Sequence, residues 1–445
     1  MTAWRWVCRR GGSGPSRWPR SWHVSREAAD VRVVFTDHTT VPGGAQLALS
    51  RLLAASAGWD ASLVVPRGPL GAYAALSRGG PVGVVRAGPT LRPGAGSAEL
   101  HSQVRHALDV MRQVGALVLR QEVRRADVLY ANSARSAVYT TVVGALLRKP
   151  VVVHLRDAVS RQALGTTGYK AMTRLVLPRA AAVVANSRYT LELAERCAPL
   201  SGLTSVIHSP VGDVSSGEPP APRLKVERIG MVARISPWKG QDLLIKAFAL
   251  AYPGEDVTLH LAGAPLFGES DHLARLRQLA TELGVAERVV FHGHVRDVGA
   301  FIDSLDIAVQ CSTQPEPLGQ NVLQYLTRGR PVVAMAEGGP LELVGDGVTG
   351  VLIPPRDVEA LVIALQGLSG PEVRRSLSNA ARGSALAVQG EALHRTHDLL
   401  SAVLDREFAF RRYSSWCRNS GFDAFPCVRL AEWAAASVYR RARPR

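Results

Sequence analysis

The chain has 445 residues, of which 47% are hydrophobic, and a formal net charge of +16 at pH 7. This length exceeds what one ordinary hydrophobic core accommodates, so we expect two domains of the usual size. The five cysteines are widely separated and form neither a CxxC pair nor a cluster with histidines. Their pattern indicates a reducing compartment and argues against a structural zinc site.

Targeting signals are absent from the sequence pattern. No apolar run reaches the roughly 18 to 20 residues that cross a bilayer, and the start, rich in Trp and Arg, lacks the apolar core of a secretory signal. We therefore expect a cytoplasmic protein. Arginines are concentrated in two basic extensions, residues 1–30 and 405–445. These could contact the anionic inner face of a membrane or an anionic substrate, or be plain solvated tails. Nucleic acid is a poor fit, because no recognisable binding module surrounds the arginines.

Residues 31–208 alternate short β-branched runs with longer amphipathic segments, which predicts parallel strands joined by helices. We expect an acceptor-side domain here, of the doubly wound Rossmann-like kind. A helix should begin after Gly43–Gly44, which follows the first strand. The expected strands cover residues 31–36, 62–65, 127–132, 150–155 and 181–186.

Residues 209–226 open with a stretch dense in Pro, Gly and Ser, which predicts a linker. The alternation then starts again, so a second Rossmann-like domain is expected over residues 227–404. Its final helix should lie against the first domain or the hinge. Ligands of open α/β sheets sit beyond the carboxyl ends of the strands, so the two domains should face one another across a cleft. The expected strands cover residues 227–234, 257–263, 288–293, 307–312, 331–335 and 350–354.

The segment 229–248 combines two cations with a helix start. A strand ends at Arg234, a short loop follows, and Lys239–Gly240 opens a helix. Two cations beside the free N–H groups of a helix N-terminus suit a diphosphate. They would also stabilise charge that grows on a leaving group. The alternative is a surface Arg and Lys on an ordinary loop.

The segment 313–345 places a carboxylate and carboxamides around a second helix start. Glu316 precedes a loop with Gly319, and Gln320, Asn321 and Val322 lie at the start of the helix, with Gln324 one turn on. Such groups can hold sugar and ribose hydroxyls while backbone amides take phosphate oxygens. The alternative is an acidic helix start followed by a routine Gly–Pro turn.

Taken together, these two segments resemble the donor-binding half of glycosyltransferase family 4, whose members are retaining enzymes of the GT-B fold. The family's pattern is a strand followed by Arg and Lys, a Glu with a second Glu eight positions later, PVV, GG-x-x-E and D-G-x-x-G. This chain has Gln324 in place of the second Glu. The matching residues, in order, are Arg234, Lys239, Glu316, 331–333, Gly338, Gly339, Glu342 and 346–350.

The resemblance extends more weakly into the first half. Gly43 and Gly44 look like the family's Gly-rich loop, where the backbone approaches the donor. The segment PVVVHLRD resembles the strand that ends in the family's His–Asp pair, with Asp157 in register. Arg156 then occupies the usual His position, and His154 lies two residues earlier. Because residues at i and i+2 of a strand share a face, either could reach the sugar; a satisfied strand histidine is the alternative for His154.

The resemblance implies a retaining, metal-independent hexosyltransferase that takes a sugar from a nucleotide-diphosphate donor, with no other cofactor. Arg234 and Lys239 would meet the β-phosphate charge, Glu316 the sugar hydroxyls, and Gln324 the ribose. A glycan, a lipid-linked sugar or a small molecule would accept the sugar, as in cell-surface polysaccharide or glycoconjugate synthesis. Gln324 and the displaced His keep a second hypothesis open, a catalytically inactive module that binds a sugar nucleotide or glycan. A GT-B epimerase is a third.

Overall fold

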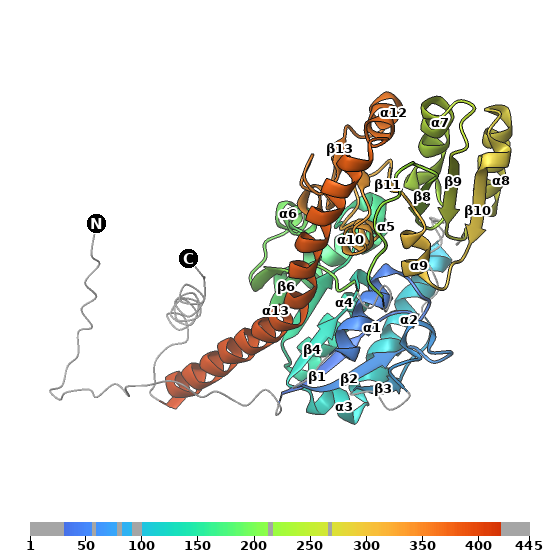
Figure 1. The fold of residues 1–445 in the computed structure, drawn as a ribbon. Helices are drawn as coiled ribbons and strands as arrows, with labels where there is room; N and C mark the ends of the chain where they lie inside the picture. Colours follow the sequence, from blue (N-terminus) through green and yellow to red (C-terminus); the bar gives the residue numbers. More distant parts are fainter. Residues whose placement is uncertain are drawn as a thin grey trace, which may run out of the picture.

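The computed structural model describes residues 31–55, 59–77, 82–90, 100–211, 217–265 and 269–419. Two parallel β-sheets follow one another along the chain, with helices packed against them (Figure 1). This arrangement confirms the expected α/β class with two Rossmann-like sheets. The expectations for residues 1–30 and 420–445 lie outside the described residues.

The first sheet has seven parallel strands in the order β3-β2-β1-β4-β5-β6-β7. Its strands are Arg32–Thr36 (β1), Asp60–Val65 (β2), Gly83–Arg86 (β3), Val128–Ala131 (β4), Val151–Leu155 (β5), Ala182–Ala185 (β6) and Leu203–Val206 (β7). Its helices are Gly44–Ala54 (α1), Leu100–Val118 (α2), Gln121–Arg125 (α3), Ala134–Leu147 (α4), Arg161–Ala171 (α5) and Arg188–Cys197 (α6).

The second sheet has six parallel strands in the order β10-β9-β8-β11-β12-β13, and all six were predicted. Its strands are Arg228–Val232 (β8), Thr258–Ala262 (β9), Val289–Gly293 (β10), Ile307–Gln310 (β11), Val332–Met335 (β12) and Val351–Ile353 (β13). The helices after β8 are Gln241–Ala251 (α7), Ser270–Glu282 (α8), Val298–Asp303 (α9), Gln320–Thr327 (α10), Pro340–Leu343 (α11), Val358–Gly367 (α12) and Pro371–Asn419 (α13).

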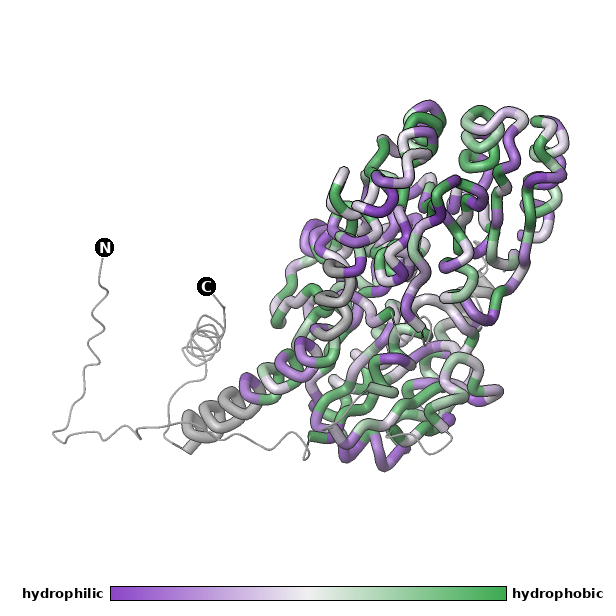
Figure 2. The backbone as a smooth tube through the Cα atoms, in the orientation of Figure 1, coloured by the Kyte–Doolittle hydropathy of each residue, from purple (hydrophilic) through white to green (hydrophobic). Residues whose placement is uncertain are grey.

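Buried central strands explain why the sequence revealed most of both sheets. Every residue of β4, β5 and β6 is buried, as parallel strands covered on both faces must be, and their residues are apolar except for Tyr130 and His154. Figure 2 shows hydrophobic and hydrophilic stretches alternating along the backbone of both halves. The strands β3 and β7 were missed. They form the two edges of the first sheet, and none of their residues is fully buried. An edge strand needs no apolar run, so β7 reads only LTSV.

The long helix α13 joins the two halves. Leu377 and Ala381 belong to the cores of the second half, whereas Leu399 and Leu400 pack in the core of the first. This confirms the expectation that the last helix of the second half lies against the first. This helix continues beyond residue 404, the expected end of the second domain, to Asn419.

Arginines of the second half hold the end of the predicted linker. Their guanidinium groups donate to backbone carbonyls, which are otherwise unsatisfied in a segment without secondary structure. Residues 217–224 are therefore packed as part of the second half. The bonds run from Arg328 to Gly217 at 2.9 Å, from Arg382 to Pro219 at 3.0 Å, and from Arg374 to Arg223 and Leu224 at 2.8 and 3.0 Å.

Candidate active site

Lys239 and Glu316 form an ion pair where the loops after β8 and β11 meet. The backbone N–H of Thr313 donates to the carbonyl of Trp238 at 2.8 Å, which fastens one loop to the other. The hydroxyl of Ser312 donates to Glu316 Oε1 at 2.6 Å, and Lys239 Nζ lies 3.9 Å from the centre of the Trp238 ring. The structure thus brings together two residues that the sequence singled out separately.

Glycine at position 240 makes this approach of the loops feasible. Gly240 has φ 74°, in the left-handed region, and a Cβ there would lie 1.9 Å from the carbonyl oxygen of Cys311. The Cys311 thiol donates to the Gly240 carbonyl at 3.1 Å, and burial raises the pKa of that thiol above its usual range. Cys311 is therefore a packing residue here.

Arg234 lies in the same loop as Lys239. The side-chain amide of Gln241, in the first turn of α7, donates to the Arg234 carbonyl at 2.8 Å and fixes the loop backbone. The Arg234 guanidinium lies 3.7 Å from the carboxylate of Glu269, a partner that sequence reasoning missed. Glu269 and Ser312 are single polar residues without a motif of their own, so no local signal marks them.

The helix α10 begins beside Glu316. Its cap is Gly319 at φ 86°, no side chain caps its N-terminus, and no acidic residue stands in its first turn. Asn321 and Gln324 are 8% and 9% exposed, and Val322 is fully buried. Gln320 is half-buried, and its Nε2 has no hydrogen-bond partner. The predicted site residues of this segment therefore surround one helix N-terminus that can accept an anion.

The glycine pair of the first half also opens a helix. Gly43 is the N-cap of α1 without a side-chain cap, and a side chain at Gly44 would meet no atom within 4 Å. Gln46, two residues into the helix, donates to Asp37 at 3.2 Å. The backbone at Gly44 is thus open to close approach, and its contact with a donor stays a prediction.

Asp37, which directly follows β1, is the centre of a polar cluster that sequence reasoning missed. Tyr73 and Asn132 each donate to its carboxylate at 2.6 Å. Burial alone raises the pKa of Asp37, but hydrogen bonds from His38, Tyr73 and Asn132 outweigh it and hold the pKa below its usual value. The Asp37 carboxylate therefore stays charged inside the fold. Its place directly after a strand was the only available signal.

Residues 150–157, which resemble the family's His–Asp strand, include both buried and exposed side chains. His154 lies within β5 and is 2% exposed, in agreement with the expected strand over residues 150–155. Its Nδ1 lies 2.6 Å from the Tyr130 hydroxyl, and burial lowers the pKa of its ring well below the usual value. Arg156 is 5% exposed and donates to Asn132 at 3.0 Å. Only Asp157 is exposed. In this conformation neither His154 nor Arg156 is open to a sugar.

A contact between the halves lies next to Glu316. The two carboxylate oxygens of Glu342 accept hydrogen bonds from the backbone N–H groups of Arg188 and Tyr189 in α6, each at 2.8 Å. His208 Nε2 lies 3.5 Å from the same carboxylate. Burial tends to raise the pKa of Glu342, but these donors outweigh it, and the pKa lies below its usual value.

Two family models match consecutive parts of the chain. The model of Glycosyltransferase Family 4 matches residues 46–212, and the model of Glycosyl transferases group 1 matches residues 218–384. The chain belongs to glycosyltransferase family 4. The two sheets are those of the GT-B fold. In the structure of this family 4 chain, Lys239 and Glu316 of the matching pattern are in contact.

Solved structures share this fold. The Anabaena protein Alr3699/HepE, solved in complex with UDP and glucose, is 26% identical and matches with a TM-score of 0.68, over 83% of this chain and 100% of that one. Sucrose-phosphate synthase from Thermosynechococcus elongatus matches with a TM-score of 0.66 at 18% identity, over 83% of this chain and 98% of that one. At 18% identity, the match to sucrose-phosphate synthase shows only that the fold is shared.

Curated relatives of this family 4 chain include two actinobacterial enzymes. The D-inositol 3-phosphate glycosyltransferase of Mycobacterium marinum is 34% identical over 37% of this chain. The GDP-mannose-dependent alpha-(1-6)-phosphatidylinositol monomannoside mannosyltransferase of Mycolicibacterium smegmatis is 32% identical over 46% of this chain. The matches span 34% and 55% of those proteins.

Among the residues that the structure describes, no group of three or more His, Cys, Asp or Glu side chains could hold a metal ion. Within the described ranges, no helix is long and apolar enough to cross a membrane.

Proposed function

We propose that this chain is a retaining, metal-independent hexosyltransferase that takes its sugar from a nucleotide-diphosphate donor. The observation that carries the proposal is the pairing of Lys239 with Glu316, with Arg234 in the same loop and the uncapped N-terminus of α10 beside it. Cations and helix amides suit a diphosphate, and a carboxylate suits sugar hydroxyls. UDP and glucose are bound in the Alr3699/HepE complex, which supports this class of donor.

In the proposed reaction, the bond between the anomeric carbon and the β-phosphate oxygen breaks, and a bond from that carbon to an acceptor oxygen forms. The departing nucleoside diphosphate gains negative charge, which Arg234, Lys239 and the α10 amides would stabilise. The acceptor proton leaves with that diphosphate. Glu316 would orient the sugar and Gln324 the ribose, whose hydroxyls a carboxamide can bind as donor and acceptor.

The backbone at Gly43–Gly44 and the exposed Asp157 are proposed to contact the donor from the first half. Both lie beyond carboxyl ends of strands of the first sheet, where ligands of such folds bind. His154 and Arg156 would take part only after a rearrangement that exposes them. A change of that kind is compatible with enzymes that close two domains around a substrate.

The acceptor is proposed to be a glycan, a lipid-linked sugar or a small molecule of glycoconjugate synthesis. The names of the two relatives refer to D-inositol 3-phosphate and to phosphatidylinositol monomannoside. We further propose a cytoplasmic location with peripheral contact to an anionic membrane. Leu108 and Met111 on α2, 50% and 61% exposed, and the nearby Leu119 at 76% support such a contact beside the arginines of this region.

Thermal stabilisation by UDP-, GDP-, ADP- and dTDP-sugars tests the donor site, with wild-type protein and Lys239→Ala. One nucleotide class should raise the melting temperature of the wild type and leave the variant unchanged. Mass spectrometry should then detect a transferred hexose, and EDTA should not reduce the rate. Unchanged turnover of every accepted donor in Lys239→Ala would refute the assignment.

Gln324 favours one alternative, a non-catalytic module that binds a sugar nucleotide or glycan. If position 324 requires a negative charge, the carboxamide would abolish transfer but not binding. Release of nucleoside diphosphate that depends on an acceptor would exclude this alternative. Restoration of activity by Gln324→Glu in an otherwise silent protein would support it.

A further inference from the structure

The positive end of helix α6 is capped by a carboxylate from the other half of the chain. Its first N–H groups, those of Arg188 and Tyr189, have no partner within the helix and donate to Glu342, 154 and 153 residues away. The helix has no acidic residue in its own first turn. The charge that its dipole attracts is therefore supplied by Glu342.

A second group of bonds joins α6 to the loop of Glu316. The hydroxyls of Ser187 and Thr190 both donate to the carbonyl of Pro317, the latter at 3.1 Å. Pro317 directly follows Glu316, whose own carbonyl accepts the N–H of Gly339 at 2.8 Å. The start of α6 thus holds the Glu316 loop and, through Glu342, the turn against which that loop is packed.

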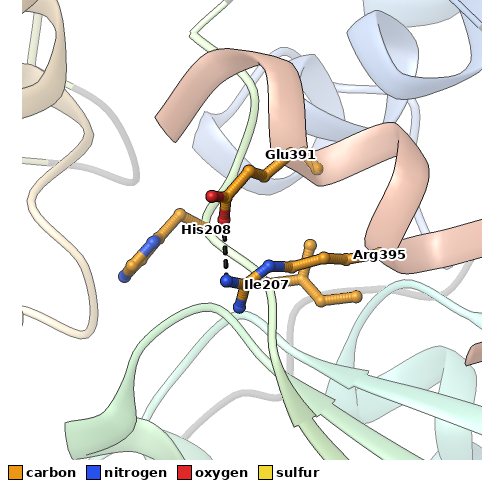
Figure 3. Close-up of a pocket in the computed structure, with 5 residues that line it drawn as sticks. Ile207, His208, Glu391 and Arg395 are labelled. Carbon is orange, nitrogen blue, oxygen red and sulfur yellow. Dashed lines mark ion pairs between the residues drawn. The ribbon is translucent and has the colours of Figure 1, made fainter. Parts of the chain in front are cut away.

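His208 adds a third component where the chain leaves the first sheet. Its ring nitrogen lies 3.5 Å from Glu342, and its neighbours Glu391 and Arg395 of α13 form an ion pair of 2.7 Å (Figure 3). Arg395 also donates to the Val206 carbonyl at 3.2 Å. In Figure 3 the His208 side chain points away from this pair. The segment that follows β7 therefore contacts α13 on one side and Glu342 on the other.

We propose that Glu342 is a positioning residue for transfer: it docks the halves through α6 and thereby sets Glu316 against the groups of the first half. The inference rests on the proposed function and deepens it. Glu342 acts through Glu316, not on the reacting atoms. Because Arg234 and Lys239 belong to the second half alone, donor binding survives loss of the docking contact, whereas transfer does not.

The substitution Glu342→Gln tests the contact itself. It keeps the size of the side chain but replaces one acceptor oxygen and removes the charge. The matched control is Glu192→Gln, the same change on α6 at an exposed surface pair with Arg196. Hydrogen exchange of the amides at 188 and 189 should be protected in the wild type and in the control, and lose protection in Glu342→Gln. Equal protection in all three proteins would overturn the docking contact.

Kinetics test the positioning role. With the fold intact, shown by an unchanged melting temperature, Glu342→Gln should lower kcat about 10- to 100-fold, the value of a charge-assisted hydrogen bond. The donor KM should change by less than about threefold, and Glu192→Gln should match the wild type. Lost protection with unchanged kcat would overturn the positioning role. A wild type that transfers no sugar would instead refute the proposed function. Hydrogen exchange of the amides at 188 and 189 would then be the test of the docking contact.

Discussion

The ion pair between Lys239 and Glu316 predicts a specific pattern of stability losses. Glu316 is 6% exposed, and after Lys239→Met it keeps the Ser312 hydroxyl at 2.6 Å as its side-chain donor. Removing one partner of a buried pair costs about 3–5 kcal/mol because the other charge stays buried. Since the Lys239 side chain is 15% exposed, water can partly replace it, and we expect a loss of about 2–3 kcal/mol.

The double variant Lys239→Met/Glu316→Gln separates the charge effect from packing. It removes both charges and retains two side chains of similar size, so its stability should lie within about 1 kcal/mol of the wild type. Urea unfolding followed by tryptophan fluorescence is a suitable assay, because Trp238 contacts Lys239. If the single and double variants lost the same stability, the loss would not come from the unpaired charge of Glu316, and this prediction would be wrong. Both variants should lose the donor-induced rise in melting temperature.

Gly240→Ala should cost about 3 kcal/mol or more in urea unfolding, because its Cβ would lie 1.9 Å from the Cys311 carbonyl at a φ of 74°; Gly284→Ala, at φ 69° with open space, should cost about 1 kcal/mol. Arg374→Met removes donors to four backbone carbonyls, two of them in the linker, so limited trypsin digestion should cut the linker faster than in the wild type. Burial, helped by neighbouring positive charge, lowers the pKa of His260 to about 4. The unfolded chain then binds a proton that the folded chain does not, so stability should fall as the pH drops from about 6.5 to 4, and less so in His260→Gln. A His260→Gln variant with the wild-type pH profile would contradict this assignment.

Local sequence patterns predicted the elements whose burial is continuous along the chain. All six strands of the second sheet and five strands of the first contain apolar runs, and the central strands of each sheet are covered on both faces. The edge strands β3 and β7 escaped prediction for the opposite reason. A final helix was predicted, and its length across both halves depends on packing against two cores.

The part of the candidate site in the second half of the chain was the part most accessible from sequence. Arg234, Lys239, Glu316 and Gln324 stand after strands and around helix starts, so local order alone places them on one edge of the sheet. Their assignment to substrate contacts remains a prediction. Gly240 was named only as the start of a helix, whereas its need for a left-handed backbone follows from the nearness of Cys311.

The sequence by itself indicated the fold class through its periodicity, and it indicated the family through motif residues within single segments that resemble the pattern of family 4. Only the tertiary structure decided that His154 is buried against Tyr130, that Asp37 gathers a polar cluster, and that Glu342 caps α6. These contacts join residues from 24 to 154 positions apart. Their partners are set by how the sheets and halves pack together, which no local pattern encodes.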